Sequence, residues 1–341
     1  MAKHRRVLLI YTGGTIGMMK DPRTGALQPM DLEHLEDLVP ELGNIPAALS
    51  TASLEPVMDS SDMGPADWVR IAQLIAQHPN EDGYVVLHGT DTMAYTASAL
   101  SYLLEGLTKP VVLTGALLPL GVLRTDGKEN LLTAIEIAAA HTDGVATLQE
   151  VAIYFEYSLY RGNRAVKTHA ERFEAFRSPN WPRLAEAGVH IRWNLAAMLP
   201  KRTGPLDVHP LLDPNVGVVR LFPGITGEWV RHSLATPGLR GAVLTTFGSG
   251  NGPRNEDFLN ALREARARGI VLVNATQCFG GRVEQGRYET SRAFNDMGIT
   301  PASDMTVEAA VTKLMFLFGQ GLAERVVQER FGVPLCGELT I

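Results

Sequence analysis

The segment Val7-Leu8-Leu9-Ile10-Tyr11-Thr12-Gly13-Gly14-Thr15 joins a short apolar run to a turn that contains two adjacent glycines. An apolar run that does not alternate with polar residues is typical of a strand buried on both faces of a parallel sheet. The same pattern recurs at Tyr84–Leu87, Val111–Leu113, Val151–Phe155, Val216–Leu221, Ala242–Leu244 and Ile270–Val273. We therefore expect each of these runs to form a strand.

Between these runs lie segments in which apolar residues recur with the period of a helix. They are Pro65–Gln77, Met93–Leu104, Glu129–Ala140 and Glu256–Arg268. Alternation of buried strands with amphipathic helices is typical of a mostly parallel sheet that carries helices on both faces. The sequence therefore predicts an α/β fold.

The chain has 341 residues, more than the roughly 250–300 at which a single hydrophobic core stops growing, so about two domains are expected. The segment Leu195–Val216 lacks periodicity and is rich in proline, as connectors between lobes are. We place the boundary near residue 205. A larger N-terminal α/β domain (1–205) then precedes a smaller C-terminal α/β domain (206–341).

Charge and composition exclude several classes of protein. The net charge is -6, with 31 basic and 37 acidic residues, which argues against a nucleic-acid partner. Cys278 and Cys336 are the only cysteines, too few for a disulfide framework, so a reducing compartment fits. The basic N-terminus resembles a signal peptide, but its apolar run stops at Thr12, too early for one. No stretch of the sequence approaches the about 20 consecutive apolar residues that a membrane-spanning helix needs. We expect a cytoplasmic protein.

Small polar residues and glycines follow four of the expected strands. They are Thr12–Thr15, His88–Thr92, Thr114–Ala116 and Thr245–Gly252. Ligands bind outside the carboxyl ends of strands in open α/β sheets, so we expect these loops to converge on one site. Thr12–Gly17 on its own is compatible with a plain turn, and it matches neither of the common phosphate-binding fingerprints.

Two of the polar segments have a structural interpretation as well as a functional one. His88-Gly89-Thr90-Asp91-Thr92 precedes a helical pattern, so its Thr and Asp either cap that helix or present a hydroxyl and a carboxylate to a ligand, while His88 fits a buried structural role. Met58–Met63 likewise either caps the helix that Pro65 begins or grips a carboxylate. The nine histidines form no pair with helical metal-ligand spacing, so we expect no metal.

Taken together, Tyr11–Gly17 and Asp82–Met93 resemble the paired signature of the bacterial-type L-asparaginase/glutaminase family. Asp59–Met63, Tyr160–Arg164, Thr276–Cys278 and Asp304–Glu308 resemble its cytoplasmic type I branch. The resemblance implies hydrolysis of L-asparagine to L-aspartate and ammonia without a cofactor, and glutamine as a potential minor substrate. It also implies a homodimer, often paired into a homotetramer, with active sites at subunit contacts.

The resemblance also assigns catalytic roles. Thr15 matches the first catalytic threonine and would be the nucleophile, and Thr90, Asp91 and Lys167 match the second Thr, Asp and Lys. By its local pattern alone, Lys167 is an ordinary solvated lysine. A Thr hydroxyl needs a base, and Lys167 could serve if desolvation lowers its pKa more than the Asp91 carboxylate raises it.

Substrate binding is assigned in the same way. Asp59, Ser60 and Ser61 match the segment that holds the α-carboxylate, Asp91 the contact to the α-amino group, and Ala116 a backbone contact near the amide.

The loop after the first threonine departs from the family pattern. Many members carry a tyrosine there, but Met18–Leu27 has none, and Ala26 occupies the slot. The partner of the Thr15 hydroxyl is therefore open. Tyr288 and Asn251, in stretches that the family brings near a neighbouring subunit's site, are substitutes to consider, with interface packing as the alternative for Tyr288.

Two other functions are compatible with the sequence. The asparaginase-like subunit of a tRNA-dependent amidotransferase shares both threonine motifs, although it usually carries an extra N-terminal domain, and this acidic chain offers no basic surface for tRNA. An amino-acid sensor that kept the pocket and lost turnover is the non-enzymatic alternative, which the missing loop tyrosine leaves open. Release of ammonia separates these functions.

Overall fold

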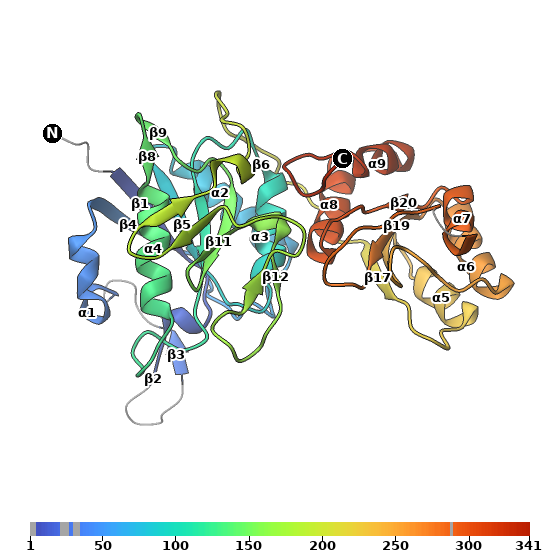
Figure 1. Cartoon of the computed structure of the whole chain (residues 1–341), viewed down its shortest axis with the longest axis horizontal. Helices are drawn as coiled ribbons and strands as arrows, with labels where there is room; N and C mark the ends of the chain where they lie inside the picture. The colour runs from blue at the N-terminus through green and yellow to red at the C-terminus, as the bar shows by residue number, and fades with distance from the viewer. Residues whose placement is uncertain (1–4, 21–26, 30–34, 287–288) are drawn as a thin grey trace. The chain divides into compact units, whose positions relative to one another are not determined.

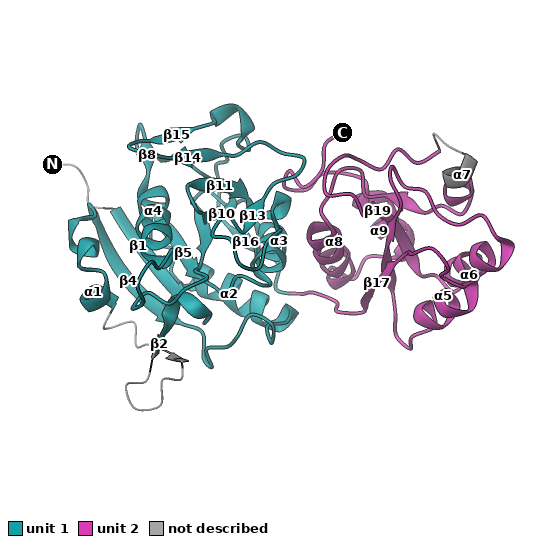
Figure 2. Ribbon diagram, turned by 60° about the horizontal axis from the view of Figure 1, so that its bottom comes forward, with its two compact units in different colours: residues 1–210 teal, residues 211–341 magenta. Residues whose placement is uncertain are grey.

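A computed structural model describes residues 5–20, 27–29, 35–286 and 289–341. The chain divides into two compact units, Met1–Pro210 and Leu211–Ile341 (Figure 2). The division falls inside the proline-rich segment Leu195–Val216. Each unit has its own sheet and its own hydrophobic core.

The N-terminal unit is built on an eight-stranded sheet (Figure 1). In spatial order its strands are β15 (Ile191–Trp193), β14 (Ala185–Ala187), β11 (Ser158–Arg161), β10 (Val151–Phe155), β7 (Val111–Thr114), β5 (Gly83–Leu87), β1 (Arg5–Tyr11) and β4 (Ala47–Ser53). Neighbours from β10 to β4 run parallel, and β11, β14 and β15 continue the sheet antiparallel. The parallel part aligns the carboxyl ends of β1, β5 and β7 along one edge.

Helices flank this sheet because its central strands are apolar on both faces. They are α2 (Pro65–Gln77), α3 (Met93–Leu103) and α4 (Gly127–Ala139). One core cluster joins Val7, Leu9 and Val85 to the α4 residues Leu131 and Ile135. Side chains alternate along a strand, so Leu8 and Ile10, which are also buried, point to the opposite face.

The edge of the sheet departs from the buried-run pattern. Strand β4 consists of half-buried and exposed residues, because β1 is its one partner among the described strands. Strands β10 and β11 are joined by a tight turn at Glu156 and Tyr157, both with positive φ (43° and 62°). Apolar runs alone identify neither β4 nor β11.

The C-terminal unit contains a parallel four-stranded sheet in the order β17, β18, β19, β20. Its elements are β17 (Val216–Arg220), α5 (Gly227–Leu234), β18 (Gly241–Thr246), α6 (Glu256–Ala267), β19 (Val271–Thr276), α7 (Glu289–Asp296), β20 (Thr300–Pro301), α8 (Val307–Gly319) and α9 (Glu324–Phe331). Its core joins Val230 of α5 and Phe258 of α6 to Leu244 and Leu272 of the sheet. The predicted α/β fold, with a larger N-terminal and a smaller C-terminal α/β part, is confirmed.

Shorter elements complete the two units. The strand pairs are β2 (Met18–Lys20) with β3 (Leu27–Pro29), β6 (Leu104–Glu105) with β16 (Asp207–Val208), β8 (His141–Thr142) with β9 (Val145–Ala146), and β12 (Val166–Lys167) with β13 (Phe176–Arg177). The short helices are η1 (Thr15–Gly17), α1 (Leu35–Leu38), η3 (Pro40–Asn44), η4 (Gly162–Arg164) and η5 (Leu195–Ala197). Among the described residues, no helix combines the length and the apolar character that a membrane crossing requires.

Candidate active site

The turn that follows β1 packs directly against the turn that follows β5. Gly14 has a φ of 84°, and a Cβ at this position would overlap the backbone of Gly89. Thr12 reinforces the contact, because its amide and its hydroxyl both donate to the Leu87 carbonyl, at 3.1 and 3.0 Å. Glycine is therefore required at position 14, and the loops that carry Thr15 and Thr90 lie side by side.

The loop Met58–Ser61 closes the same site from another side. The Met58 amide donates to the Thr12 carbonyl at 3.0 Å, and the Ser60 hydroxyl lies 2.6 Å from where a Cβ on Gly89 would be. The carboxylate of Asp59 accepts from the amide and the hydroxyl of Ser61 at 2.8 and 2.7 Å. These hydrogen bonds lower the pKa of Asp59.

Capping does not explain this loop or the one after β5. Helix α2 begins at Pro65, and it is Asp67 that accepts from the Gly64 amide, at 3.0 Å. Helix α3 begins at Met93, and the hydroxyl of Thr92 donates to the Ser60 carbonyl at 2.6 Å instead of capping the helix. The polar side chains of both loops are therefore available to bond to one another or to a ligand that lies between the loops.

Lys167 joins Thr90 and Asp91. Its ammonium lies 2.8 Å from the Thr90 hydroxyl and 2.6 Å from a carboxylate oxygen of Asp91. The Lys167 side chain is 16% exposed, whereas that of Asp91 is 69% exposed. Strand β12 holds the lysine by pairing Lys167 with Phe176, whose ring packs 5.1 Å from that of Phe155. The expectation of an ordinary solvated lysine is wrong, because a contact across 77 positions of sequence holds it in the site.

Ala116 reaches the site from β7. A Cβ on the preceding Gly115 would overlap the carbonyl of His88, so this loop is pressed against the loop that carries Thr90. Ala116 itself is buried. The carboxyl ends of three neighbouring strands, together with Met58–Ser61, thus bring Thr15, Ser60, Thr90 and Ala116 into one cluster.

His88 lies beneath this cluster and is fully buried. One ring nitrogen, Nδ1, lies 2.6 Å from the Gly89 carbonyl, so it carries the proton, and Nε2 accepts from the Thr96 hydroxyl at 2.8 Å. Burial lowers the pKa of His88 to about 4, against the opposing effects of the Gly89 carbonyl and the Asp59 charge. The imidazole is neutral at pH 7 and has the structural role that the sequence suggests.

His88 makes the stability of the fold depend on pH. The unfolded chain binds a proton at the ordinary pKa of 6.5, whereas the folded protein does so only near 4, so stability falls as the pH drops from 6.5 towards 4. Between pH 7 and pH 5 we expect wild type to lose about 2 kcal/mol more unfolding free energy than a His88→Asn variant. Urea unfolding of both proteins at both pH values measures this difference. Equal losses would contradict the assignment.

Glu156 contributes to the same pH range with the opposite sign. Burial, followed by the charges of Glu129, Asp126 and Glu174, raises the pKa of Glu156 to about 7. The folded state therefore binds this proton more tightly than the unfolded state, and Glu156 favours folding as the pH falls below 7. Because Glu156 is present in both proteins, its contribution cancels when wild type is compared with the His88→Asn variant.

The remaining residues singled out in the sequence belong to the other unit or fall outside the described residues. The loop Thr245–Gly252 belongs to the C-terminal unit, where Asn251 pairs with Phe247 through their backbones. Tyr288 and Ala26 lie outside the described residues. Asp126 and Asn130, which hold the Ala116 loop from α4, were missed because an Asp at a helix start is usually a cap.

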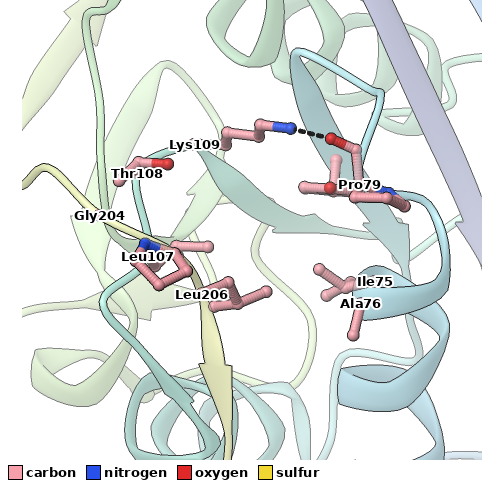
Figure 3. A pocket seen from close by; sticks show the side chains of 10 residues that line it. Ile75, Ala76, Pro79, Leu107, Thr108, Lys109, Gly204 and Leu206 are labelled. Atoms are coloured by element: carbon pink, nitrogen blue, oxygen red, sulfur yellow. Dashed lines mark hydrogen bonds between the residues drawn. The ribbon is translucent and has the colours of Figure 1, made fainter.

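A pocket of about 380 Å³ lies away from these residues (Figure 3). Its lining comes from the end of α2, the start of β5, residues 107–109 and residues 204–206. The Lys109 ammonium donates there to the Pro79 carbonyl at 2.6 Å, and burial lowers its pKa. This pocket lies at the amino end of β5, opposite the edge that carries Thr90.

Comparison with known proteins places the chain in a family. Residues 6–198 match the family model described as asparaginase, N-terminal, and residues 215–331 match the glutaminase/asparaginase C-terminal domain. The chain is 45% identical to L-asparaginase 1 of Escherichia coli K12 over 98% of both chains. The chain belongs to the asparaginase family. The resemblance that the paired threonine motifs suggested is therefore confirmed.

Solved structures of the asparaginase family agree over the whole chain. L-asparaginase I from Vibrio cholerae superposes with a TM-score of 0.89 at 41% identity, covering 99% of this chain and all of the other.

A glutamyl-tRNA(Gln) amidotransferase component of Pyrococcus abyssi is 32% identical over 98% of this chain but only 76% of its own length. The amidotransferase likeness is thus weaker and leaves part of that protein unmatched.

Proposed function

We propose that this protein is an L-asparaginase that hydrolyses L-asparagine to L-aspartate and ammonia, with glutamine as a poorer substrate. The observation that carries the proposal is the contact of Lys167 with both Thr90 and Asp91, beside the loop of Thr15, in a chain of the asparaginase family. Amide hydrolysis needs a nucleophile, a group that moves protons and donors for the developing oxyanion. The cluster supplies the first two, with Thr15 as the nucleophile and Lys167 beside Thr90 as the group that moves protons.

In the proposed mechanism, the Thr15 hydroxyl attacks the side-chain amide carbon and forms an ester as ammonia leaves. Thr90 and Lys167 then activate the water that hydrolyses this ester. The 2.8 Å contact between the Lys167 nitrogen and the Thr90 hydroxyl is short enough for direct proton transfer between the two groups. The Asp91 carboxylate, 2.6 Å from the same nitrogen, holds the lysine beside Thr90.

Substrate binding is proposed to use charge and hydrogen bonding on either side of the threonines. The exposed carboxylate of Asp91 suits the α-ammonium group of asparagine, and Ser60 and Ser61 suit its α-carboxylate. Asp59 carries the same sign as the α-carboxylate, so its part is to fix the shape of this loop by accepting from the amide and the hydroxyl of Ser61. The single proton of the Ser61 hydroxyl would have to turn from Asp59 to the substrate carboxylate when asparagine binds.

We expect Asp59→Ala to raise KM for asparagine about tenfold and to leave kcat within about twofold, since the lost bonds shape binding and not the reacting atoms. Asp62→Ala is the matched control, because the exposed Asp62 side chain lies in the same turn. Initial rates at varied asparagine concentration measure both constants. A fall in kcat with unchanged KM would contradict this role.

The domain roles and the assembly are also proposed. The N-terminal domain, to about residue 205, would carry the catalytic threonines, and the remainder would contribute to a subunit interface. A homodimer or homotetramer would let Asn251 or Tyr288 of a neighbouring subunit approach Thr15, in place of the loop tyrosine. The protein would work in the cytoplasm, consistent with its two cysteines.

Release of ammonia tests the proposed function. Purified protein alone is incubated with L-asparagine, L-glutamine or D-asparagine, and ammonia is measured. We expect fast release from L-asparagine and slower release from L-glutamine. No release from any of the three would overturn the proposal in favour of an amino-acid sensor, and release that requires tRNA or a second protein would favour the amidotransferase.

A further inference from the structure

Asp126 stands at the start of α4 but does not cap it. Its carboxylate instead accepts from the Leu117 amide, at 2.9 and 3.1 Å from its two oxygens, and from the Leu118 amide at 3.0 Å. The Asp126 residue is only 4% exposed. The side-chain amide of Asn130 lies 3.4 Å from one of the same oxygens. Within residues 35–286 and the other described ranges, no ion pair involves Asp126, so N–H donors stabilise its charge.

Two further side chains fix the ends of the same loop. Asn130 is fully buried, and its side-chain nitrogen Nδ2 donates to the Gly115 carbonyl at 3.0 Å. The hydroxyl of Thr125 donates to the Leu118 carbonyl at 2.9 Å. Ala116 lies between these fixed points, and its own N–H and carbonyl make no hydrogen bond to the part of the chain that the structure describes.

The Ala116 carbonyl and the Leu117 amide are the two ends of one peptide group. A negative charge bonded to the N–H end of a peptide polarises it and makes the carbonyl at the other end a stronger acceptor. Asp126 therefore does two things to the Ala116 carbonyl: it fixes its direction and it increases its negative charge. Its field reaches across this edge of the sheet, since Asp126 is among the charges that raise the pKa of Glu156.

We propose that Asp126 is a positioning residue that aims and polarises the Ala116 carbonyl towards the amide nitrogen of the substrate. The inference rests on the proposed function, in which that nitrogen leaves as ammonia. The intermediate formed by attack of Thr15 collapses by breaking its C–N bond. The nitrogen takes up the proton given up by the Thr15 hydroxyl, and the acyl group stays on Thr15 as an ester. A polarised carbonyl stabilises the positive charge that grows on the nitrogen.

The proposal predicts a loss that depends on the leaving group. An ester substrate such as L-aspartic acid β-methyl ester forms the same acyl group on Thr15, but it releases methanol and has no N–H to donate to Ala116. In Asp126→Asn, the side-chain NH2 faces backbone N–H donors, so at least one bond to the loop is lost and the charge is removed. We expect kcat/KM for asparagine to fall about 10- to 100-fold and that for the ester to fall less than about threefold.

Asp67→Asn is the matched control, because Asp67 also lies at a helix start but caps its own helix. Both substrates should be hydrolysed by this variant at wild-type rates. Asn130→Ala serves as a second variant if Asp126→Asn does not fold. It frees the Gly115 carbonyl and the Glu156 amide and removes the 3.4 Å contact to Asp126, but it keeps the carboxylate of Asp126. It should produce a smaller loss with the same preference for the amide.

Equal losses on amide and ester, in either variant, would overturn the proposal and leave a structural role. Failure of wild type to release ammonia would instead overturn the proposed function, so the two failures are distinguishable.

Discussion

Replacement of Thr15 by valine is expected to lower kcat for L-asparagine by at least about 10³-fold, because the variant lacks the attacking oxygen. The groups proposed to hold the substrate, Ser60, Ser61 and Asp91, remain in place. Aspartate should therefore still bind, and isothermal titration of the variant with aspartate measures this. Loss of turnover with retained binding is the result that a nucleophile predicts.

Thr12→Val is the matched control. Thr12 lies in the same turn, has the same shape and uses its hydroxyl for the Leu87 carbonyl. The Thr12→Val variant should be less stable than wild type, but its kcat should fall by less than about tenfold. Wild-type turnover by Thr15→Val would move the nucleophile to Thr90.

Replacement of Lys167 by methionine is expected to lower kcat by about 10²- to 10⁴-fold, since the Thr90 hydroxyl loses its one hydrogen-bond partner among the described residues. Steady-state rates measure this effect, and a rapid acid quench followed by intact-mass spectrometry shows whether the ester on Thr15 accumulates. Accumulation would assign Lys167 to the second step.

Lys109→Met provides the control for a buried lysine. Lys109 donates to the Pro79 carbonyl at the opposite edge of the same sheet (Figure 3). Its replacement should leave kcat within about twofold. A comparable loss in both variants would show that the effect of Lys167→Met is a general loss of folding.

Sequence patterns predict the centre of each sheet well. Strands such as β1 and β10 are apolar on both faces, and this pattern has no other common explanation in a chain with intervening helices. The edges of the N-terminal sheet are not predicted, because β4 mixes half-buried and exposed residues and β14 and β15 are three residues each. Short antiparallel strands depend on a neighbour that the local sequence does not reveal.

The sequence likewise predicts some residues of the candidate site and not others. Glycine-rich turns after strands identify Thr15 and Thr90, since carboxyl ends of parallel strands share one edge. Lys167 could be assigned only from the family resemblance, because its partners lie 76 and 77 positions away. Asp126 carries a local signal, but that signal is the one expected of a helix cap.

The most direct test of the account is to locate the acyl group. Thr90→Val protein, in which hydrolysis of the ester should be slower than its formation, is mixed with L-asparagine, quenched in acid within milliseconds and digested for peptide mass mapping. We predict a β-aspartyl ester on the peptide that contains Thr15, absent from the Thr15→Val/Thr90→Val double variant. An aspartyl group on any other residue, or full turnover of asparagine by the double variant, would contradict the assignment of Thr15 as nucleophile.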